Sequence, residues 1–197
     1  FHIKIFSCGK NNLTFTKNNI EYNIYKTNFT LFKCPFSFSY IVNFFKNYKN
    51  SDLIHYHYPW PIIEALILFC KKKPTVVTYH SDVIAQKKIF FFTKFLFYLI
   101  LNKIDFIVPS SKIYYKSSSF LQSIPENKIK VIPIGIDDLL KTKIHNEKFF
   151  LKENNLSKND YLLFIGRNTK YKGINYLIRS AKYIKSKIVL AGCNNLD

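Results

Sequence analysis

A basic segment bounded by glycines, Gly166 to Gly173, follows an apolar stretch typical of a strand and precedes one typical of a helix. Ligands of doubly wound sheets bind beyond the carboxyl ends of the strands, where a helix N-terminus offers free N–H groups to a phosphate. We therefore expect Arg167 and Lys172 to bind one diphosphate together. The Gly-Lys-Ser/Thr ending of a Walker loop is absent, and an ordinary turn with exposed cations is the alternative.

A second polar group, His80, Ser81 and Asp82, comes directly after the apolar run Thr75 to Tyr79. A histidine at the carboxyl end of a strand faces the crevice where a substrate lies, and an imidazole can bind a sugar hydroxyl or transfer a proton. The alternative is a helix cap formed by Ser81 or Asp82, with His80 buried nearby.

A third group lies in Asp52 to Pro61, where His55 and His57 share one face of a predicted strand. We expect His57, nearer the strand end, to reach the crevice and His55 to be a core histidine. A three-histidine metal site with His80 is a weaker alternative, because no carboxylate accompanies these residues. The turn that contains Trp60 offers an aromatic surface for a sugar or for a neighbouring loop.

Two further groups follow predicted strands and have ordinary structural interpretations. Ser110 and Ser111 come after Phe106 to Pro109 and before a helix candidate, so a helix cap is the first interpretation and contact with a hydroxyl or anion the second. Asp137 ends the segment that begins at Pro133 and is typical of a turn.

Apolar runs alternate with helix candidates along the whole chain, which predicts an α/β fold with a parallel sheet. The expected strands are Ile3 to Cys8, Tyr22 to Tyr25, Leu53 to His57, Thr75 to His80, Phe106 to Pro109, Ile129 to Ile132, Leu162 to Gly166 and Ile188 to Gly192. The expected helices are Phe38 to Tyr48, Ile62 to Cys70, Lys87 to Asn102, Lys112 to Leu121 and Ile174 to Ile184. A first crossover helix belongs between Gly9 and Glu21, although Thr14, Phe15 and Thr16 have poor helix propensity.

The composition changes between Asp137 and Asp160, where Lys, Asn and Glu dominate. We therefore predict a first domain at 1–137, a linker at 138–160 and the start of a second domain at 161–197. The chain lacks methionine, and the second domain is too short to bury a sheet of its own, so we expect a fragment cut at both ends.

The formal net charge of +18 favours polyanions or anionic membranes as partners. Only two of the 30 basic residues are arginines, whereas nucleic-acid binders rely on arginine for base and phosphate contacts. The preference for lysine over arginine and the many Asn, Ile, Phe and Tyr residues resemble the amino-acid composition towards which the proteins of an AT-rich genome drift. We expect no nucleic-acid partner.

The four cysteines are widely spaced, which indicates reduced thiols in a cytoplasmic protein rather than a disulfide framework. The most apolar stretch, Ile89 to Leu101, is too short to cross a bilayer. With its lysines it could lie on a membrane surface, and a buried helix is the preferred interpretation.

Five stretches, in this order and at these separations, resemble the retaining GT-B glycosyltransferases of family 4, also called glycosyl transferases group 1. They are Asp52 to Pro59, Pro74 to Asp82, Asp105 to Ser111, Lys128 to Asp137 and Tyr161 to Ala181. The resemblance covers nearly all of the chain from Asp52 onward and is much weaker before it.

This resemblance implies two Rossmann-like domains, with a nucleotide-sugar donor bound mainly by the C-terminal domain and an acceptor by the N-terminal one. Arg167 and Lys172 would neutralise the donor diphosphate in place of a metal ion, and His80 matches the family's active-site histidine. His57, Ser110, Asp82 and Gly9 would line the acceptor side or the cleft. We expect a GDP- or UDP-linked donor, no cofactor, retention of the anomeric configuration, and a glycan or lipid-linked acceptor.

The sequence departs from the family pattern in three places. Cys8-Gly9-Lys10 stands where the family has a loop with paired glycines, and Ile134 stands where asparagine is usual. The acidic Glu-x7-Glu segment would lie beyond Asp197, so we expect residues 1–197 alone to be inactive.

Two competing interpretations belong to other classes. A non-catalytic basic remnant that binds an anionic membrane or polyanion would explain the charge, but not the intact glycine-flanked cations. Another Rossmann enzyme, such as a nucleotide-sugar epimerase, would need a GxGxxG after the first strand, which is absent. Within the glycosyltransferase interpretation, we expect a cytoplasmic protein that associates with the inner face of the plasma membrane.

Overall fold

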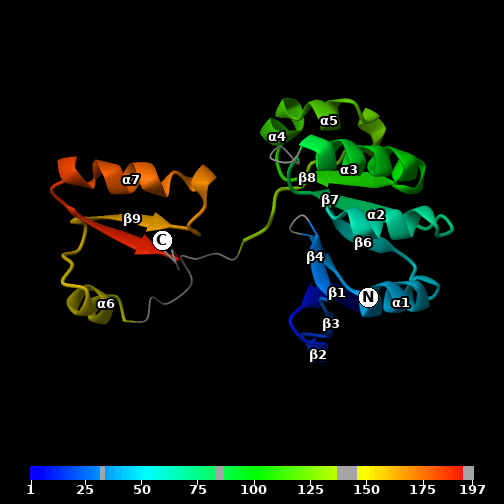
Figure 1. Ribbon diagram of the computed structural model, residues 1–197, viewed down its shortest axis with the longest axis horizontal. Coiled ribbons are helices and arrows are strands. Elements are labelled where there is room, and N and C mark those ends of the chain that lie inside the picture. The colour runs from blue at the N-terminus through cyan, green and yellow to red at the C-terminus, as the bar shows by residue number, and fades with distance from the viewer. Residues whose placement is uncertain (32–33, 83–86, 137–145, 193–197) are drawn as a thin grey trace. The chain divides into compact units, whose positions relative to one another are not determined.

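The computed structural model describes residues 1–31, 34–82, 87–136 and 146–192, and it divides the chain into two units, Phe1–Gly135 and Ile136–Asp197 (Figure 1). The predicted end of the first domain, Asp137, and the last residues of the predicted second domain lie outside the described residues. Both units are α/β, as the alternation of apolar runs and helix candidates predicts.

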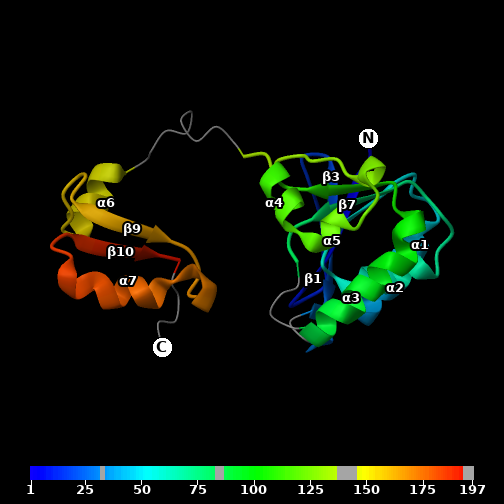
Figure 2. The same cartoon turned by 90° about the horizontal axis from the view of Figure 1, so that it is seen from above.

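The main sheet of the first unit is parallel and has the order β6-β7-β8. Its strands are β6 (Ile54–Tyr58), β7 (Thr75–Tyr79) and β8 (Phe106–Pro109), with His57 opposite Thr78 and Tyr79 opposite Pro109. Helices α2 (Pro61–Leu68) and α3 (Lys87–Ile100) lie side by side along this unit in both views (Figures 1 and 2). They cover the face of the sheet from which Tyr56, Tyr58, Val77 and Tyr79 project into the core.

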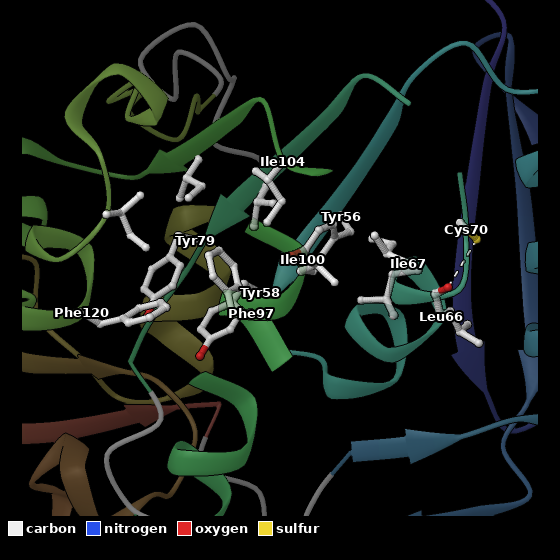
Figure 3. Close-up of a cluster of buried hydrophobic side chains, with 14 of the residues drawn as sticks. Tyr56, Tyr58, Leu66, Ile67, Cys70, Tyr79, Phe97, Ile100, Ile104 and Phe120 are labelled. Carbon is white, nitrogen blue, oxygen red and sulfur yellow. Dashed lines mark hydrogen bonds between the residues drawn. The ribbon is translucent and has the colours of Figure 1, made fainter. Parts of the chain in front are cut away.

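The core of this unit is rich in aromatic rings (Figure 3). Tyr58 and Tyr79 stack with their centroids 4.4 Å apart, and Phe97 of α3 meets the Tyr58 ring edge-on at 5.1 Å. On α3, residues 93, 96, 97 and 100 are buried, which is the spacing of one helical face. Each large apolar side chain buried here contributes about 2 to 3 kcal/mol.

Helix α1 (Phe38–Tyr48) has the predicted bounds because Ser37 caps it and Tyr40, Phe44 and Tyr48 form its buried face. Ser37 Oγ accepts from the Tyr40 N–H at 3.2 Å. The sequence predicts one helix from Lys112 to Leu121, but the structure has two helices there, α4 (Lys112–Ser117) and α5 (Ser119–Gln122). The division occurs at Ser118, whose hydroxyl accepts from Leu121 N–H and starts α5.

The predicted first crossover helix is wrong, because the chain between Gly9 and Glu21 forms a β-hairpin. Strands β2 (Leu13–Lys17) and β3 (Ile20–Lys26) are antiparallel, and β3 also pairs in parallel with β1 (Ile3–Gly9). Asn18 and Asn19 both have positive φ, at 52° and 61°, which suits a two-residue hairpin turn. Thr and Phe prefer strands, and this local preference decides the outcome.

Two short strands, β4 (Phe29–Leu31) and β5 (Cys34–Phe36), form a second hairpin that the sequence analysis does not predict. Conversely, the expected strand Ile129 to Ile132 is reduced to a single parallel bridge between Ile107 and Ile129. Its backbone still runs beside β8, with Lys130 N–H donating to Ile107 C=O at 3.0 Å. Proline at position 109 has no N–H to extend the ladder.

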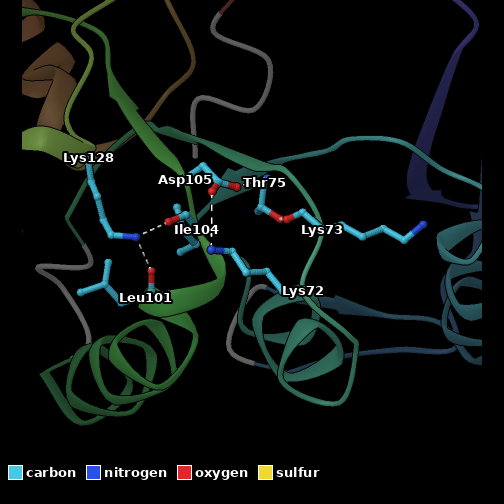
Figure 4. A network of polar contacts seen from close by, with 7 residues as sticks. All are labelled: Lys72, Lys73, Thr75, Leu101, Ile104, Asp105 and Lys128. Atoms are coloured by element: carbon cyan, nitrogen blue, oxygen red, sulfur yellow. Dashed lines mark hydrogen bonds and ion pairs between the residues drawn. The ribbon is translucent and has the colours of Figure 1, made fainter.

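At the amino end of the main sheet, polar side chains hold the starts of the strands together (Figure 4). The Asp105 carboxylate accepts from Thr75 N–H at 2.8 Å and lies 3.9 Å from Lys72 Nζ. Lys128 Nζ donates to the carbonyls of Leu101 and Ile104. This edge of the sheet is therefore structural.

The second unit has a parallel pair of strands, β9 (Tyr161–Ile165) and β10 (Lys187–Ala191), connected by α7 (Ile174–Ser180). A short helix, α6 (Glu147–Glu153), lies within the segment predicted as a linker. Its sequence, EKFFLKE, has good helix formers at most positions, which the overall polarity of the segment conceals. Among the described residues, no helix has the length and apolar character needed to cross a membrane.

Candidate functional site

The structure brings His57 and His80 into direct contact. His57 is the fourth residue of β6, and His80 follows the last residue of β7, where its backbone N–H donates to Tyr58 C=O at 3.2 Å. His57 Nδ1 lies 2.7 Å from His80 Nε2, so one of these nitrogens donates to the other. The two rings are nearly parallel, with centroids 5.0 Å apart.

His55 extends this pair into a row of three imidazoles. Its ring stacks on His57 at 5.0 Å, and its Nε2 lies 2.7 Å from Thr78 Oγ1. The predicted core position of His55 is wrong, because the ring is exposed on the side of β6 opposite to buried Tyr56 and Tyr58. The strand alternates strictly, so both histidines share the face that the aromatic core does not occupy.

Positive charge is disfavoured on His55 and His57. The pKa of His57 is lowered by partial burial first and then by the nearby rings of His55 and His80. The pKa of His55 is lowered by partial burial and then by His80. In the described part of the chain, no three His, Cys, Asp or Glu side chains are placed to share a metal ion, so we do not carry the three-histidine metal site forward.

Asp82 and Ser110 have different surroundings from the two histidines. Asp82 Oδ1 accepts from the hydroxyls of Tyr79 at 2.7 Å and Ser118 at 3.0 Å, which ties the end of β7 to the start of α5. Ser110 is half-buried directly after β8, and no hydrogen bond joins it to His57 or His80. Its neighbour Ser111 is the α4 cap, with its hydroxyl accepting from Tyr114 N–H at 3.0 Å.

A groove runs beside the histidines between β1 and β6. It is lined by Cys8 of β1, Cys34 of β5, His57 and Trp60, among others. The Trp60 indole donates to Pro35 C=O at 3.4 Å and packs against the Tyr40 ring at 4.7 Å. Trp60 thus packs against neighbouring elements, which was one of the two interpretations of its turn.

Gly9, at the end of β1 near this groove, has a packing role. A Cβ atom at this position would lie 2.6 Å from Ile24 Cγ2 of the paired strand β3. A side chain at position 9 would therefore force the Ile24 side chain or the backbone to shift.

Sequence analysis missed Glu64 of α2, which is completely buried. Neither of its carboxylate oxygens has a hydrogen-bond partner among the described residues, and the same holds for the nearby Tyr56 hydroxyl. Burial raises the pKa of Glu64 to about 8, opposed weakly by the Trp60 backbone amide, which lies close without forming a good hydrogen bond. A single acidic residue inside the apolar run PIIEALIL was the available signal.

In the second unit, Arg167 and Lys172 flank the end of β9. Gly166 N–H donates to Ala191 C=O at 2.9 Å, which closes the strand pair, and the chain then turns through a 3-10 helix at Lys170–Lys172. Lys172 Cδ lies 4.0 Å from the position that a Cβ on Gly166 would take, so this side chain folds back towards the strand end. Gly173 has φ 73°, a left-handed conformation that favours glycine, and starts α7.

Both cations are exposed and available to an anion. Lys172 Nζ lies 5.5 Å from the centroid of the Tyr171 ring. Within residues 146–192, no carboxylate forms an ion pair with Arg167 or Lys172, whereas Lys158 pairs with Glu147 at 3.2 Å. Both cations follow β9 closely in the sequence, and their joint binding of one anionic ligand stays a prediction.

This architecture is that of the GT-B glycosyltransferases. The chain is similar to the Anabaena protein HepE, solved in complex with UDP and glucose, with a TM-score of 0.63 and 17% identity over 87% of this chain and 47% of HepE. The HepE complex with UDP-glucose gives a TM-score of 0.61 and 14% identity, covering 99% of this chain and 62% of that one. At these identities the likeness shows the fold.

The chain belongs to Glycosyltransferase Family 4, whose family model matches residues 2–138. It is 29% identical to the O-antigen chain mannosyltransferase C of Escherichia coli over 94% of this chain and 49% of that protein. It is 30% identical to the D-rhamnosyltransferase WbpZ of Pseudomonas aeruginosa over 82% of this chain and 42% of that protein. The chain thus spans about half the length of these curated relatives.

Proposed function

We propose that this chain belongs to an enzyme that transfers a sugar from a GDP- or UDP-linked donor to a glycan or lipid-linked acceptor in polysaccharide biosynthesis. The strongest support is the pair of exposed cations, Arg167 and Lys172, beside the end of β9. The family membership and the names of the two curated relatives agree with sugar transfer. HepE was solved with UDP and with UDP-glucose, which agrees with a nucleotide-sugar donor.

In this proposal the second unit binds the donor diphosphate and the first unit provides the acceptor side. Charge grows on the nucleoside diphosphate as its bond to the sugar breaks, and fixed cations stabilise such charge. His80 contacts the transferred sugar, and the anomeric configuration is retained. Arg167 and Lys172 take the place of a metal ion at the leaving group.

Retention and metal independence can be tested on a full-length enzyme that carries this sequence. We expect the product to have the same anomeric configuration as the donor, and we expect EDTA to leave the initial rate unchanged. The measurement is proton NMR of the anomeric signal during turnover, with and without chelator. An inverted product, or activity lost to EDTA and restored by Mg²⁺ or Mn²⁺, would contradict this mechanism.

We further propose that α3 associates with an anionic membrane surface at the cytoplasmic face. Helix α3 is apolar on two sides: beside its buried face it exposes Phe91 and Phe95 at 75% and 53%. Exposed aromatic rings on a lysine-rich helix suit the interface of an anionic bilayer. A concentration of basic residues in the first unit would favour membrane docking through that unit. The sequence shows no such concentration. Phe1–Gly135 has 18 basic and 6 acidic residues, a net +12, in proportion to its length.

We expect the chain to bind vesicles that contain anionic lipid at low salt and to release them as salt screens the attraction. Replacing Phe91 and Phe95 together with serine should weaken this binding several-fold, because their apolar contact is lost. The control is Ile113→Ser on α4, a side chain that is 83% exposed. Vesicle co-sedimentation measures all three proteins. Unchanged binding in the Phe91 and Phe95 double variant would show that charge alone attracts the chain, and equal losses in both variants would contradict a specific role of α3. Vesicle binding without any nucleotide binding would favour the non-catalytic remnant.

A further inference from the structure

The contact between His57 and His80 assigns a role to a residue outside the proposed donor contacts. We propose that His57 is a positioning residue that fixes the ring orientation and the tautomer of His80. This inference rests on the proposed function only in its last step, where His80 contacts the sugar. The hydrogen bond itself is a property of the first unit alone.

Strand pairing determines this contact. His57 lies opposite Thr78, two residues before His80, and the His80 backbone is held to β6 by its hydrogen bond to Tyr58 C=O. The His80 ring therefore emerges beside the His57 ring, with 2.7 Å between Nδ1 of His57 and Nε2 of His80. His57 lies within β6, between buried Tyr56 and Tyr58, whereas His80 lies just beyond the end of β7.

A single proton between the two rings decides what His80 presents on its other nitrogen. If His57 Nδ1–H donates, His80 carries its own proton on Nδ1 and can donate to a sugar hydroxyl. If His80 Nε2–H donates, its Nδ1 is an acceptor. Without His57 both forms interconvert freely, and part of the population has the wrong form.

The contact allows only one N–H group between the two rings. Protons on both facing nitrogens, Nδ1 of His57 and Nε2 of His80, would place two N–H groups against each other at 2.7 Å. His55 on β6, Cys8 on β1 and Cys34 on β5 line the groove together with His57, and burial raises the pKa of both thiols, so neither thiol supplies a negative charge at neutral pH. Burial and the neighbouring rings lower the pKa of His57 in addition. The hydrogen bond therefore couples the tautomers of the two rings.

Nitrogen-15 NMR of the imidazoles tests this inference on the 197-residue chain without any substrate. The chain has only five histidines, so each can be assigned by replacement with glutamine. We expect a single tautomer for His80 in the unmodified chain and a mixture in His57→Leu. His57→Asn, whose amide lies near the position of Nδ1, should restore the single tautomer. His2→Gln is the control and should leave His80 unchanged.

The same variants in a full-length enzyme link the contact to turnover. We expect His57→Leu to lower kcat about tenfold with little change in donor KM, and His57→Asn to recover most of the loss. An unchanged His80 tautomer in His57→Leu would overturn the inference. An altered tautomer with unchanged kcat would leave the positioning of His80 intact and contradict the proposed role of His80 at the sugar.

Discussion

Replacing Arg167 with alanine is expected to lower turnover about a hundredfold in a full-length enzyme that carries this sequence. Arg167 is exposed beside the end of β9, without a carboxylate partner in residues 146–192, so its charge is available to a leaving diphosphate. Removing one preorganised donor of this kind costs about 3 kcal/mol of transition-state stabilisation. Because the charge grows only as the bond breaks, kcat should fall more than donor affinity.

Two matched controls separate this role from a general loss of charge. Arg179, the other arginine, is exposed on α7, and Arg179→Ala should change little. Lys182 lies 4.8 Å from the centroid of the Tyr183 ring, as Lys172 lies 5.5 Å from that of Tyr171. Lys172→Ala should therefore impair turnover, and Lys182→Ala should not. Equal kinetics for Arg167→Ala and Arg179→Ala would mean that Gly166 to Gly173 is an ordinary turn.

Glu64→Gln is expected to remove most of the pH dependence of stability between pH 5 and pH 8. Folding raises the pKa of this carboxyl from 4.5 to about 8. The unfolded chain releases the proton at lower pH than the folded chain, so stability falls as the pH rises through this window. The loss that is complete above pH 8 is on the order of 5 kcal/mol. Glutamine keeps the shape and cannot ionise.

Urea unfolding at pH 5 and pH 8 measures this effect through Trp60, the only tryptophan, which directly precedes α2. We expect similar midpoints at pH 5 and a higher midpoint for Glu64→Gln at pH 8. Glu126→Gln, at an exposed carboxyl, serves as the control. Parallel pH profiles for Glu64→Gln and the unmodified chain would show that Glu64 is ionised or solvated in the folded protein.

The most accurate predictions from the sequence rest on the spacing of apolar residues and on the positions of strand ends. Helix α1 has the predicted bounds because its apolar spacing and its Ser37 cap agree. The meeting of His57 and His80 follows from a general property of parallel strands, whose carboxyl ends share one edge of the sheet. The roles given to these residues, and to Arg167 and Lys172, stay predictions.

The features that the sequence did not predict are ones that the spacing of apolar residues does not determine. The hairpin at Asn18 and Asn19 depends on two positive φ angles. We expected a crossover helix in this segment, and that expectation took precedence over the turn that two asparagines indicate. The burial of Glu64 depends on which helix faces the sheet interior, and a single acidic residue normally indicates an exposed position. Asp82 accepts hydrogen bonds from Tyr79, three positions before it, and from Ser118, 36 positions after it, and spacing along the chain does not predict the second contact.

Strand β2 forms one edge of the β1-β3-β2 sheet, and all five of its residues are exposed. An edge of this kind offers backbone N–H and C=O groups to a strand from another molecule, which is a route to aggregation. The net charge of +18 keeps copies of the chain apart in dilute buffer. Concentrated salt screens that repulsion, so preparations of this protein should be kept at low ionic strength to remain monodisperse.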